Sequence, residues 1–361
     1  MAKFILRRVF YGLFVLLGVI TIVFFLFNIL PGDPARMMMG QRADISSIEA
    51  IQRDLGLDRP LRVQYFNFLN DISPVSWYNQ KNKDSYWFFD TNKYSGSTIL
   101  MRSGSEGVFV LKKPYLRRSY QSGRTVTSII AEAFPNTALL AVVSISIAMF
   151  FGIIIGVVSA LKRDSIFDRS ALVLAVLGMS LPSFFAAILF AWVFAFILAD
   201  FTGLNMVGSL YAVDDFGRGE YLEIRNLILP AVTLGIRPLA VVAELTRNSL
   251  LEVLSQDYIR TAYAKGLSKF HVITRHALRN AMNPIITAVS GWFASLLAGA
   301  VFVEYVFDWK GLGIVIVNAL EQYDFPVIMG TVLFISVLLI VINILIDIIY
   351  GQLDPRVRVA L

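Results

Sequence analysis

Residues 247–284 read RNSLLEVLSQDYIRTAYAKGLSKFHVITRHALRNAMNP and form a basic segment between two apolar stretches of the chain. The segment holds six Lys and Arg residues, and its acids are Glu252 and Asp257. The apolar stretches on either side are long enough to cross a lipid bilayer. The segment is therefore predicted to be a loop that joins two membrane spans.

This loop is predicted to contain a short helix over residues 257–265. Asp257 opens the helix, Lys265 lies in its last turn, and Gly266 follows where a left-handed residue ends a helix most easily. Its apolar residues recur at helical spacing and form one face: Tyr258, Ile259, Ala262 and Tyr263. A helix of nine residues is only about 13 Å long, enough to fill a groove on a partner protein.

Two further helices are predicted in the same loop. Ser268 can cap a helix over residues 269–279, and Asn283 with Pro284 can start a third. From residue spacing alone, the segment 247–284 also fits a generic basic cytoplasmic loop without a docking role.

The residues of the loop resemble a known family. YIRTAYAKGLS (258–268) followed by RHALRNAMNP (275–284) resembles the cytoplasmic EAA loop of binding-protein-dependent ABC importer permeases, and the peptide/nickel branch is the most similar. Where the general pattern has Glu-Ala-Ala, this chain has Arg260, Thr261 and Ala262, and its proline comes late, at Pro284. Both departures are usual in the peptide/nickel branch. Three other stretches also resemble it: LPGDP (30–34), LGLDRPLRVQYFNFL (55–69) and WKGLG (309–313).

The composition is typical of a polytopic membrane protein. Hydrophobic residues make up 57% of the 361 residues and charged residues 16%, and the mean hydropathy is +0.66. The chain has no Cys and only two His, His271 and His276, which excludes thiol chemistry and argues against a metal site. The net charge of +6 fits basic cytoplasmic loops, and no pattern suggests nucleic acid.

The fold class predicted is an all-α polytopic membrane protein with six transmembrane helices, of the type I ABC importer permease kind that the resemblance implies. The six spans are 9–30, 136–161, 170–199, 226–247, 285–307 and 327–350. Residues 1–30 form a cytoplasmic tip and the first span, 31–125 an extracytoplasmic cap, and 126–361 the permease core with its coupling loop, 247–284. In the second span, Gly152 and Gly156 predict a face for close helix packing.

The cap is predicted to carry an insertion between the first two spans. Residues 46–55 have the pattern of a short amphipathic helix, and 71–113 depart from the family and are rich in Trp, Tyr and Phe. Strands are expected in 71–113. Its aromatic residues fit a small packed core of the cap, or alternatively a surface that contacts a solute-binding protein or lipid headgroups.

The distribution of Lys and Arg predicts the orientation. With the N-terminus inside, the inner segments hold fourteen Lys and Arg residues and the short outer loops hold three. Both termini and the coupling loop are therefore predicted to be cytoplasmic, and the resemblance implies a bacterial inner membrane.

The resemblance implies a permease subunit that forms half of a translocation pathway for peptides or similar small solutes. Its implied partners are a second permease, either a different chain or a second copy, two ABC ATPase subunits and an extracytoplasmic solute-binding protein. In this family the loop carries a coupling helix that docks on an ATPase subunit. The residues that would dock on the ATPase are Asp257, Tyr258, Ile259, Ala262, Tyr263, Lys265 and Gly266. The sequence has no Gly-rich phosphate loop ending in Gly-Lys-Ser/Thr and no recognisable catalytic set, so no cofactor is expected and ATP hydrolysis is left to the partners.

Three residues are candidates for the pathway. Pro182 interrupts the third span, and Arg237 and Glu244, seven residues apart in the fourth span, are predicted to face the same way. Such charges also fit a self-sufficient secondary transporter or channel, although no inverted repeat is visible. An ABC exporter is a third possibility, and the solute is not encoded in any recognisable motif.

Overall fold

The long apolar runs of the sequence form long helices in the computed structural model, which describes residues 2–29, 52, 58–82, 85, 87–89, 93–94, 96–103, 106–213, 219–297 and 300–353. The described residues are mostly helical, and the chain divides into two compact units. One unit comprises Met1–Glu132, Val315–Ile344 and Tyr350–Leu361, and the other comprises Ala133–Ile314 and Leu345–Ile349. Each unit is described by itself.

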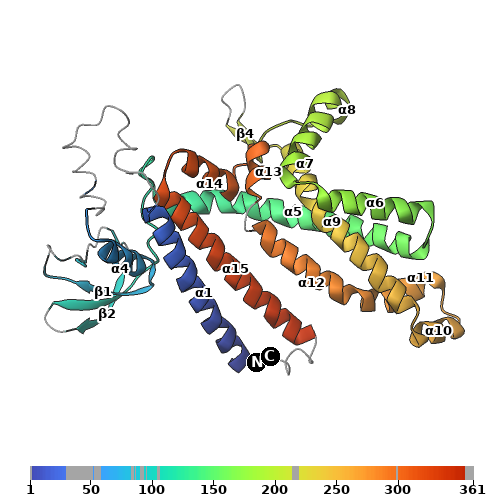
Figure 1. Cartoon of the computed structure of the whole chain (residues 1–361), viewed down its shortest axis with the longest axis horizontal. Coiled ribbons are helices and arrows are strands. Elements are labelled where there is room, and N and C mark those ends of the chain that lie inside the picture. Colours follow the sequence, from blue (N-terminus) through green and yellow to red (C-terminus); the bar gives the residue numbers. More distant parts are fainter. Residues whose placement is uncertain are drawn as a thin grey trace. The chain divides into compact units, whose positions relative to one another are not determined.

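In the first unit, two long helices lie side by side (Figure 1). They are α1 (Ala2–Ile29) and α15 (Phe325–Leu353), and the shorter α4 (Leu61–Ile72) packs against them. Their shared apolar core centres on Phe24, which is fully buried, and includes Phe68 of α4 and Leu333 of α15. A hydrogen bond of 2.7 Å between the hydroxyls of Thr21 and Tyr65 joins α1 to α4.

The same unit contains a small antiparallel sheet. Its strands are β1 (Val75–Asn79), β2 (Thr98–Ser103) and β3 (Gly107–Leu111), in the order β1-β3-β2, with Trp77 opposite Phe109. The sheet buries an aromatic core: Tyr78, Phe89, Tyr94, Val108 and Val110, with Tyr115 against it. The strands expected in 71–113 are confirmed, and these aromatic residues form a packed core.

The second unit holds most of the remaining helices. The helices before the hairpin are α5 (Val126–Leu161), α6 (Ile166–Ser180), α7 (Ser183–Phe190) with a π-helical continuation Ala191–Ile197, and α8 (Ala199–Thr202). The later helices are α9 (Arg225–Leu254), α10 (Asp257–Ala264), α11 (Lys269–His271) with a π-helical turn Val272–Ala277, α12 (Leu278–Leu297), α13 (Val301–Val306) and α14 (Leu312–Glu321). The first residues of α5, up to 132, and the last residues of α14, from 315, belong to the first unit. A short hairpin, β4 (Tyr211–Val213) with β5 (Glu220–Leu222), precedes α9. The prediction of an all-α chain is therefore incomplete.

Glycines bring α5 and α9 together. A Cβ atom at Gly156 would lie 2.5 Å from the backbone oxygen of Ala243, and one at Gly152 would lie 2.9 Å from that of Leu239. Such distances are too short for any side chain, so the backbones of the two helices are in close contact. The close-packing role predicted for Gly152 and Gly156 is confirmed.

The predicted third span is two helices and not one kinked helix. α6 and α7 meet at an angle of 109°. Leu181 and Pro182 between them are extended, with ψ of 127° and 138°. Proline has no N–H to continue the helix, and it also disfavours helical geometry in the residue before it, so the helix ends at Ser180 and a new one begins.

The predicted number of six spans is not confirmed by the described residues. Among the described residues, four helices are long and apolar enough to cross a membrane, α1, α5, α9 and α15. The bent pair α6–α7 adds a fifth if the pair is counted as one span. The predicted span 285–307 is interrupted, because α12 ends at Leu297 and α13 begins at Val301. Six unbroken transmembrane helices are therefore not observed.

Several expectations concern residues outside the described part of the chain. These are the amphipathic helix over 46–55, apart from Gln52, and the LPGDP stretch.

Candidate functional site

The predicted coupling loop folds as a helix, a sharp turn and a second helical run. α10 begins at Asp257 and ends at Ala264, one residue earlier than predicted. Gly266 has φ of +76°, and the turn is closed by hydrogen bonds from the N–H of Gly266 to Tyr263 O (2.9 Å) and from the N–H of Leu267 to Ala262 O (3.4 Å). This pair of bonds is the Schellman motif, in which a left-handed residue ends the helix. The terminating role predicted for Gly266 is confirmed.

The helical run after the turn is continuous. Ser268 caps it, as predicted, by accepting a hydrogen bond from the N–H of His271. It then passes through α11 and the π-helical turn into α12, which contains Pro284 in its interior. The prediction that a third helix starts at Pro284 is wrong, since the preceding residues are already helical.

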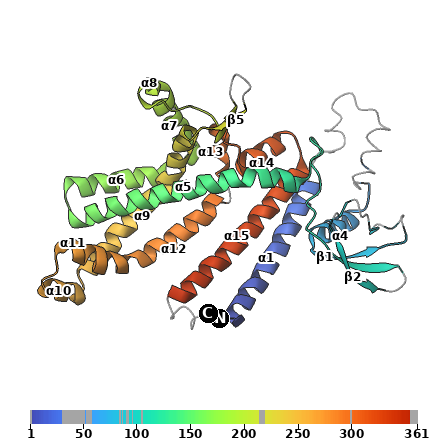
Figure 2. The same cartoon turned by 180° about the vertical axis from the view of Figure 1, so that it is seen from behind.

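The apolar face of α10 is turned inward. Ile259 is 1% exposed and Ala262 is 7% exposed. Both belong to a cluster that joins the ends of three long helices to α10 and includes Ala160 of α5, Leu250 of α9 and Ala281 of α12. α10 lies at the joined ends of α9 and α12 in both views (Figures 1 and 2). The predicted coupling loop thus packs directly onto the ends of these helices.

The outer surface of α10 presents different residues. Tyr258 and Tyr263 are each 42% exposed, although the sequence pattern put them on one face with Ile259 and Ala262. Asp257 and Arg260 are exposed and 3.5 Å apart, and Lys265 is exposed. Because Ile259 and Ala262 are covered by the chain itself, they are not available to a partner.

One exposed residue was missed by the sequence analysis. Phe270, just after the turn, is 78% exposed. Phe270 lies at helical spacing from Ile273 and Ala277, which are buried, so the sequence pattern did not indicate that Phe270 would be exposed.

A buried ion pair ties α6 to the end of α9. The Nε and Nη2 atoms of Arg247 donate hydrogen bonds of 2.6 and 2.7 Å to the two carboxylate oxygens of Asp168. Asp168 also accepts from the N–H of Asp164 at 2.9 Å, and its side chain is 1% exposed. Two parallel bonds between a guanidinium and a carboxylate fix the orientation of both groups. Arg247 is therefore a structural anchor at the first residue of the predicted coupling loop.

The three pathway candidates do not form a cluster. Pro182 is exposed at the bend between α6 and α7. Arg237 is exposed on α9, with its guanidinium carbon 6.0 Å from the centre of the Trp292 ring on α12. Glu244 is half-buried, and no ion pair links it to Arg237 within the described residues.

Comparisons with known proteins agree with this architecture. The sequence profile of the family described as "Binding-protein-dependent transport system inner membrane component" matches residues 152–359. The profile of the N-terminal part of such membrane components matches residues 1–85. The chain belongs to this family.

Relatives of the permease match it along nearly its whole length. It is 35% identical to a putative peptide permease protein of Brucella suis, with 99% of this chain and 100% of the relative covered. It is 34% identical to the di/tripeptide transport system permease protein DppB of Pseudomonas aeruginosa and 36% identical to the glutathione transport system permease protein GsiC of Pectobacterium atrosepticum, with 99% of both chains covered in each case.

The fold of the permease is also found in a solved structure. The MetNI methionine ABC transporter, in an inward-facing conformation, matches with a TM-score of 0.50 and 15% sequence identity, covering 63% of this chain and 96% of the other. This similarity concerns the fold and supports a permease core of the type I kind.

The loop of the permease that contains WKGLG is held by buried hydrogen bonds. The Thr137 hydroxyl donates to Glu304 Oε1 (2.8 Å) and accepts from the N–H of Leu312 (2.8 Å). Glu304 Oε2 accepts from the N–H of Gly313 at 2.6 Å. Glu304 is fully buried, and side chains at Gly311 or Gly313 would collide with it. The two glycines of WKGLG thus allow the loop to close over a carboxylate.

Replacing Thr137 with valine is expected to lower the free energy of unfolding by about 2 kcal/mol, because Glu304 Oε1 and the N–H of Leu312 both lose a buried partner. Thermal melting of the purified permease would measure the loss. Thr137→Ser keeps the hydroxyl and should lose less stability than the valine variant, about 1 kcal/mol for the buried methyl group. Equal melting of the valine and serine variants would show that these hydrogen bonds contribute little.

Proposed function

We propose that this chain is the permease subunit of an ATP-driven ABC importer and forms half of the translocation pathway for peptides or similar small solutes. The observation that carries the proposal is the packing of α10. Its buried side is held against the ends of α5, α9 and α12, and its other side is exposed to solvent. The names of the relatives, peptide and glutathione permeases, support the solute class. The partners would be a second homologous permease, two ABC ATPase subunits and an extracytoplasmic solute-binding protein.

The docking surface for the ATPase is proposed to be the exposed side of α10 and the turn after it. Tyr258, Tyr263 and Phe270 would supply apolar anchors, and Arg260 and Lys265 would supply charge. Aromatic anchors surrounded by polar residues are typical of protein interfaces. Asp257 lies at the start of this surface, and Gly266 sets the turn. Ile259 and Ala262 would act indirectly by holding α10 to the permease.

Coupling would follow from this packing. A displacement of α10 by the ATPase is passed to Leu250 of α9 and Ala281 of α12 through buried contacts that leave little space for independent movement. α9 and α12 would therefore move with α10 and switch the pathway between inward- and outward-facing states.

The pathway is proposed to lie along α7, α9 and α12. The bend at Pro182 lies at the start of α7, the cation–π contact joins Arg237 of α9 to Trp292 of α12, and the half-buried Glu244 lies on α9. Ionisable groups within membrane spans face protein or water, which supports this proposal. α12 together with α13 would complete a set of six spans. The excess of Lys and Arg in the inner segments supports cytoplasmic termini and a cytoplasmic coupling loop.

The role of the turn is tested by Gly266→Val. We expect the variant to insert normally but to lose the ATPase on co-purification. Gly266 has a left-handed backbone, which costs an L-residue about 1–2 kcal/mol and a β-branched residue such as valine more. The space around Gly266 is open, so the valine side chain would meet no other atom and only the backbone would be strained. Normal co-purification would contradict the role.

Two controls separate strain from bulk. Gly291→Val adds the same side chain in open space on α12, where φ is helical, and should retain the ATPase. Gly266→Asn should retain it as well, since asparagine tolerates the left-handed region. Uptake by the purified chain alone in liposomes, driven by an ion gradient without ATP, would instead favour a secondary transporter.

A further inference from the structure

A groove of about 310 Å³ lies in the first unit, between α4 and β1. Its apolar walls are Phe66 and Leu69 of α4, Val75 and Trp77 of β1, and Trp87. The other described lining residues are serines and an asparagine, so no charged side chain lines the groove within the described part of the chain. A groove of this size and polarity fits the apolar part of a small molecule.

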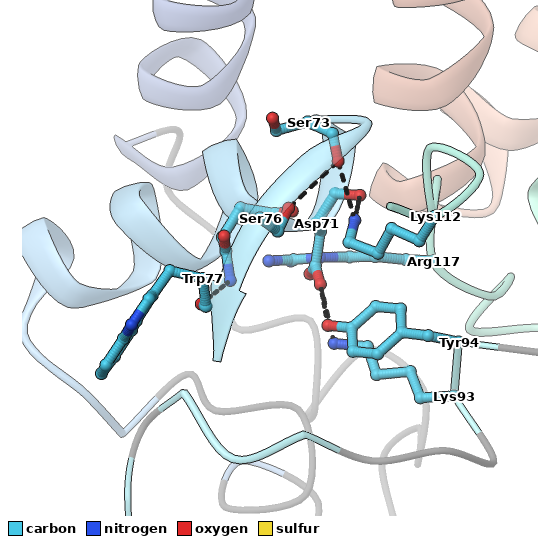
Figure 3. Close-up of polar contacts among 9 residues, drawn as sticks. Asp71, Ser73, Ser76, Trp77, Lys93, Tyr94, Lys112 and Arg117 are labelled. Atoms are coloured by element: carbon cyan, nitrogen blue, oxygen red, sulfur yellow. Dashed lines mark hydrogen bonds and ion pairs between the residues drawn. The ribbon is translucent and has the colours of Figure 1, made fainter. Parts of the chain in front are cut away.

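Hydrogen bonds fix α4 to the strands beside the groove (Figure 3). The Asn70 amide donates to the backbone oxygen of Trp77 at 3.3 Å, and the Ser76 hydroxyl donates to that of Asn70 at 2.8 Å. The amine of Lys112, just after β3, donates to the backbone oxygen of Asp71 at 2.6 Å. The Trp77 side chain points away from Asp71 in Figure 3. The folded cap therefore sets the spacing between the walls of the groove.

The walls of the groove are exposed. Phe66, Val75 and Trp87 are each 40% exposed or more, and the rings of Trp77 and Trp87 meet edge to face with their centroids 5.8 Å apart. These residues are not part of the aromatic core that surrounds Tyr78. Apolar residues that gather on a surface in this way are typical of a contact with another protein or with a membrane.

Contacts with α1 place α4 at the end of a membrane span. Residues Leu6–Phe27 of α1 are apolar enough to cross a membrane, and at 1.5 Å per residue they extend about 33 Å, close to the thickness of the hydrocarbon core. The Tyr65 ring stacks on Phe25 with centroids 5.5 Å apart, and the Tyr65 hydroxyl is hydrogen-bonded to that of Thr21. Both α1 residues lie in the last third of the span. Phe66, the next residue of α4, therefore lies near the surface of the bilayer.

The exposed apolar surface of α1 leads towards the groove. Ile22, Phe25 and Leu26 are exposed on α1. The Phe25 ring contacts Tyr65, and the Tyr65 ring lies 5.8 Å from the Phe66 ring, centroid to centroid. These ring contacts connect the exposed side of the span to the wall of the groove. An acyl chain beside α1 therefore has an apolar surface to follow onto α4.

We propose that this groove holds an acyl chain of a membrane phospholipid and thereby anchors the cap to the surface of the bilayer. In the orientation proposed above, the lipid belongs to the outer leaflet. The uncharged walls suit a hydrocarbon chain, and tryptophans such as Trp77 and Trp87 are enriched at membrane–water interfaces. ATPase docking does not enter this argument, so lipid binding at the cap and co-purification of Gly266→Val can fail independently.

Spin labels report what surrounds the groove. The chain has no Cys, so each single-cysteine variant of the full chain in phosphatidylcholine nanodiscs carries one label. Phe66→Cys places the label in the wall of the groove. Ser122→Cys is the control, an exposed site next to Gln121, which donates to the backbone oxygen of Gln322 ahead of the span Phe325–Ile348.

At Phe66 we expect the label to collide at least about three times more often with oxygen, which concentrates in hydrocarbon, than with a water-soluble nickel chelate. At Ser122 we expect the opposite preference. A preference for the chelate at Phe66 would show that the groove faces water. Low access of both reagents would show that protein covers the groove. Either result would overturn the proposal.

Lipids with brominated acyl chains locate the chain itself. Bromine quenches tryptophan emission on contact, so Trp87 should be quenched in nanodiscs of such lipids, whereas Trp309 is fully buried and should not be. Trp87→Phe should therefore lower the quenched part of the emission, and Trp309→Phe should leave it unchanged. An unchanged quenched part in Trp87→Phe would overturn the proposal, even with the label at Phe66 in lipid.

Discussion

Replacing Arg247 with methionine is expected to lower the free energy of unfolding by about 3 kcal/mol, at the lower end of the range for breaking a buried ion pair. Methionine fills much of the same volume but leaves Asp168, 1% exposed, without its cation. The cost is limited because Asp168 keeps the hydrogen bond from the N–H of Asp164. In a domain of this size such a loss lowers the melting temperature by on the order of 10 °C.

A double variant gives the control for this ion pair. Asp168→Leu combined with Arg247→Met removes both charges, so no buried charge remains unpaired, and it should be more stable than the sum of the two single changes predicts. Melting of all four proteins after purification in detergent would measure the difference. Additive effects would show that the two side chains are not coupled.

Replacing Gly156 with leucine is expected to separate α5 from α9 and to prevent accumulation of the folded permease. The first added carbon would lie 2.5 Å from the Ala243 backbone oxygen and from the Thr246 Cβ, and neither atom can move without shifting α9. Overpacking of a core commonly costs about 1–3 kcal/mol, and here the obstacle includes backbone, so we expect the upper end of that range or more.

The matched control for this change is a leucine at Gly18, where nothing lies within 4 Å of an added carbon. Gly18→Leu should be tolerated, because in a helix leucine is favoured over glycine by somewhat less than about 1 kcal/mol. Fluorescence-detected size-exclusion chromatography would compare the amounts of folded protein. Equal amounts for the two variants would contradict close contact between α5 and α9.

The coupling loop shows where sequence patterns succeed and where they stop. The left-handed turn at Gly266 and the cap at Ser268 depend on the chemistry of one or two residues, and both were predicted. The helical spacing grouped Tyr258 and Tyr263 with Ile259, but it did not indicate which of them would be covered. That depended on the position of Leu250 and Ala281, which belong to other helices.

The sequence by itself determined the apolar helices, the close-packing glycines and the turn of the coupling loop, because hydropathy and backbone preference are local properties of the chain. Only the tertiary structure decided the ion pair between Asp168 and Arg247 and the contacts of Asp71 with Lys93, Tyr94 and Lys112. In each case the outcome depends on groups distant in sequence, or on how neighbouring helices pack. No local pattern encodes the distances between such groups, since these distances are set when the helices and the cap sheet bury their apolar faces together.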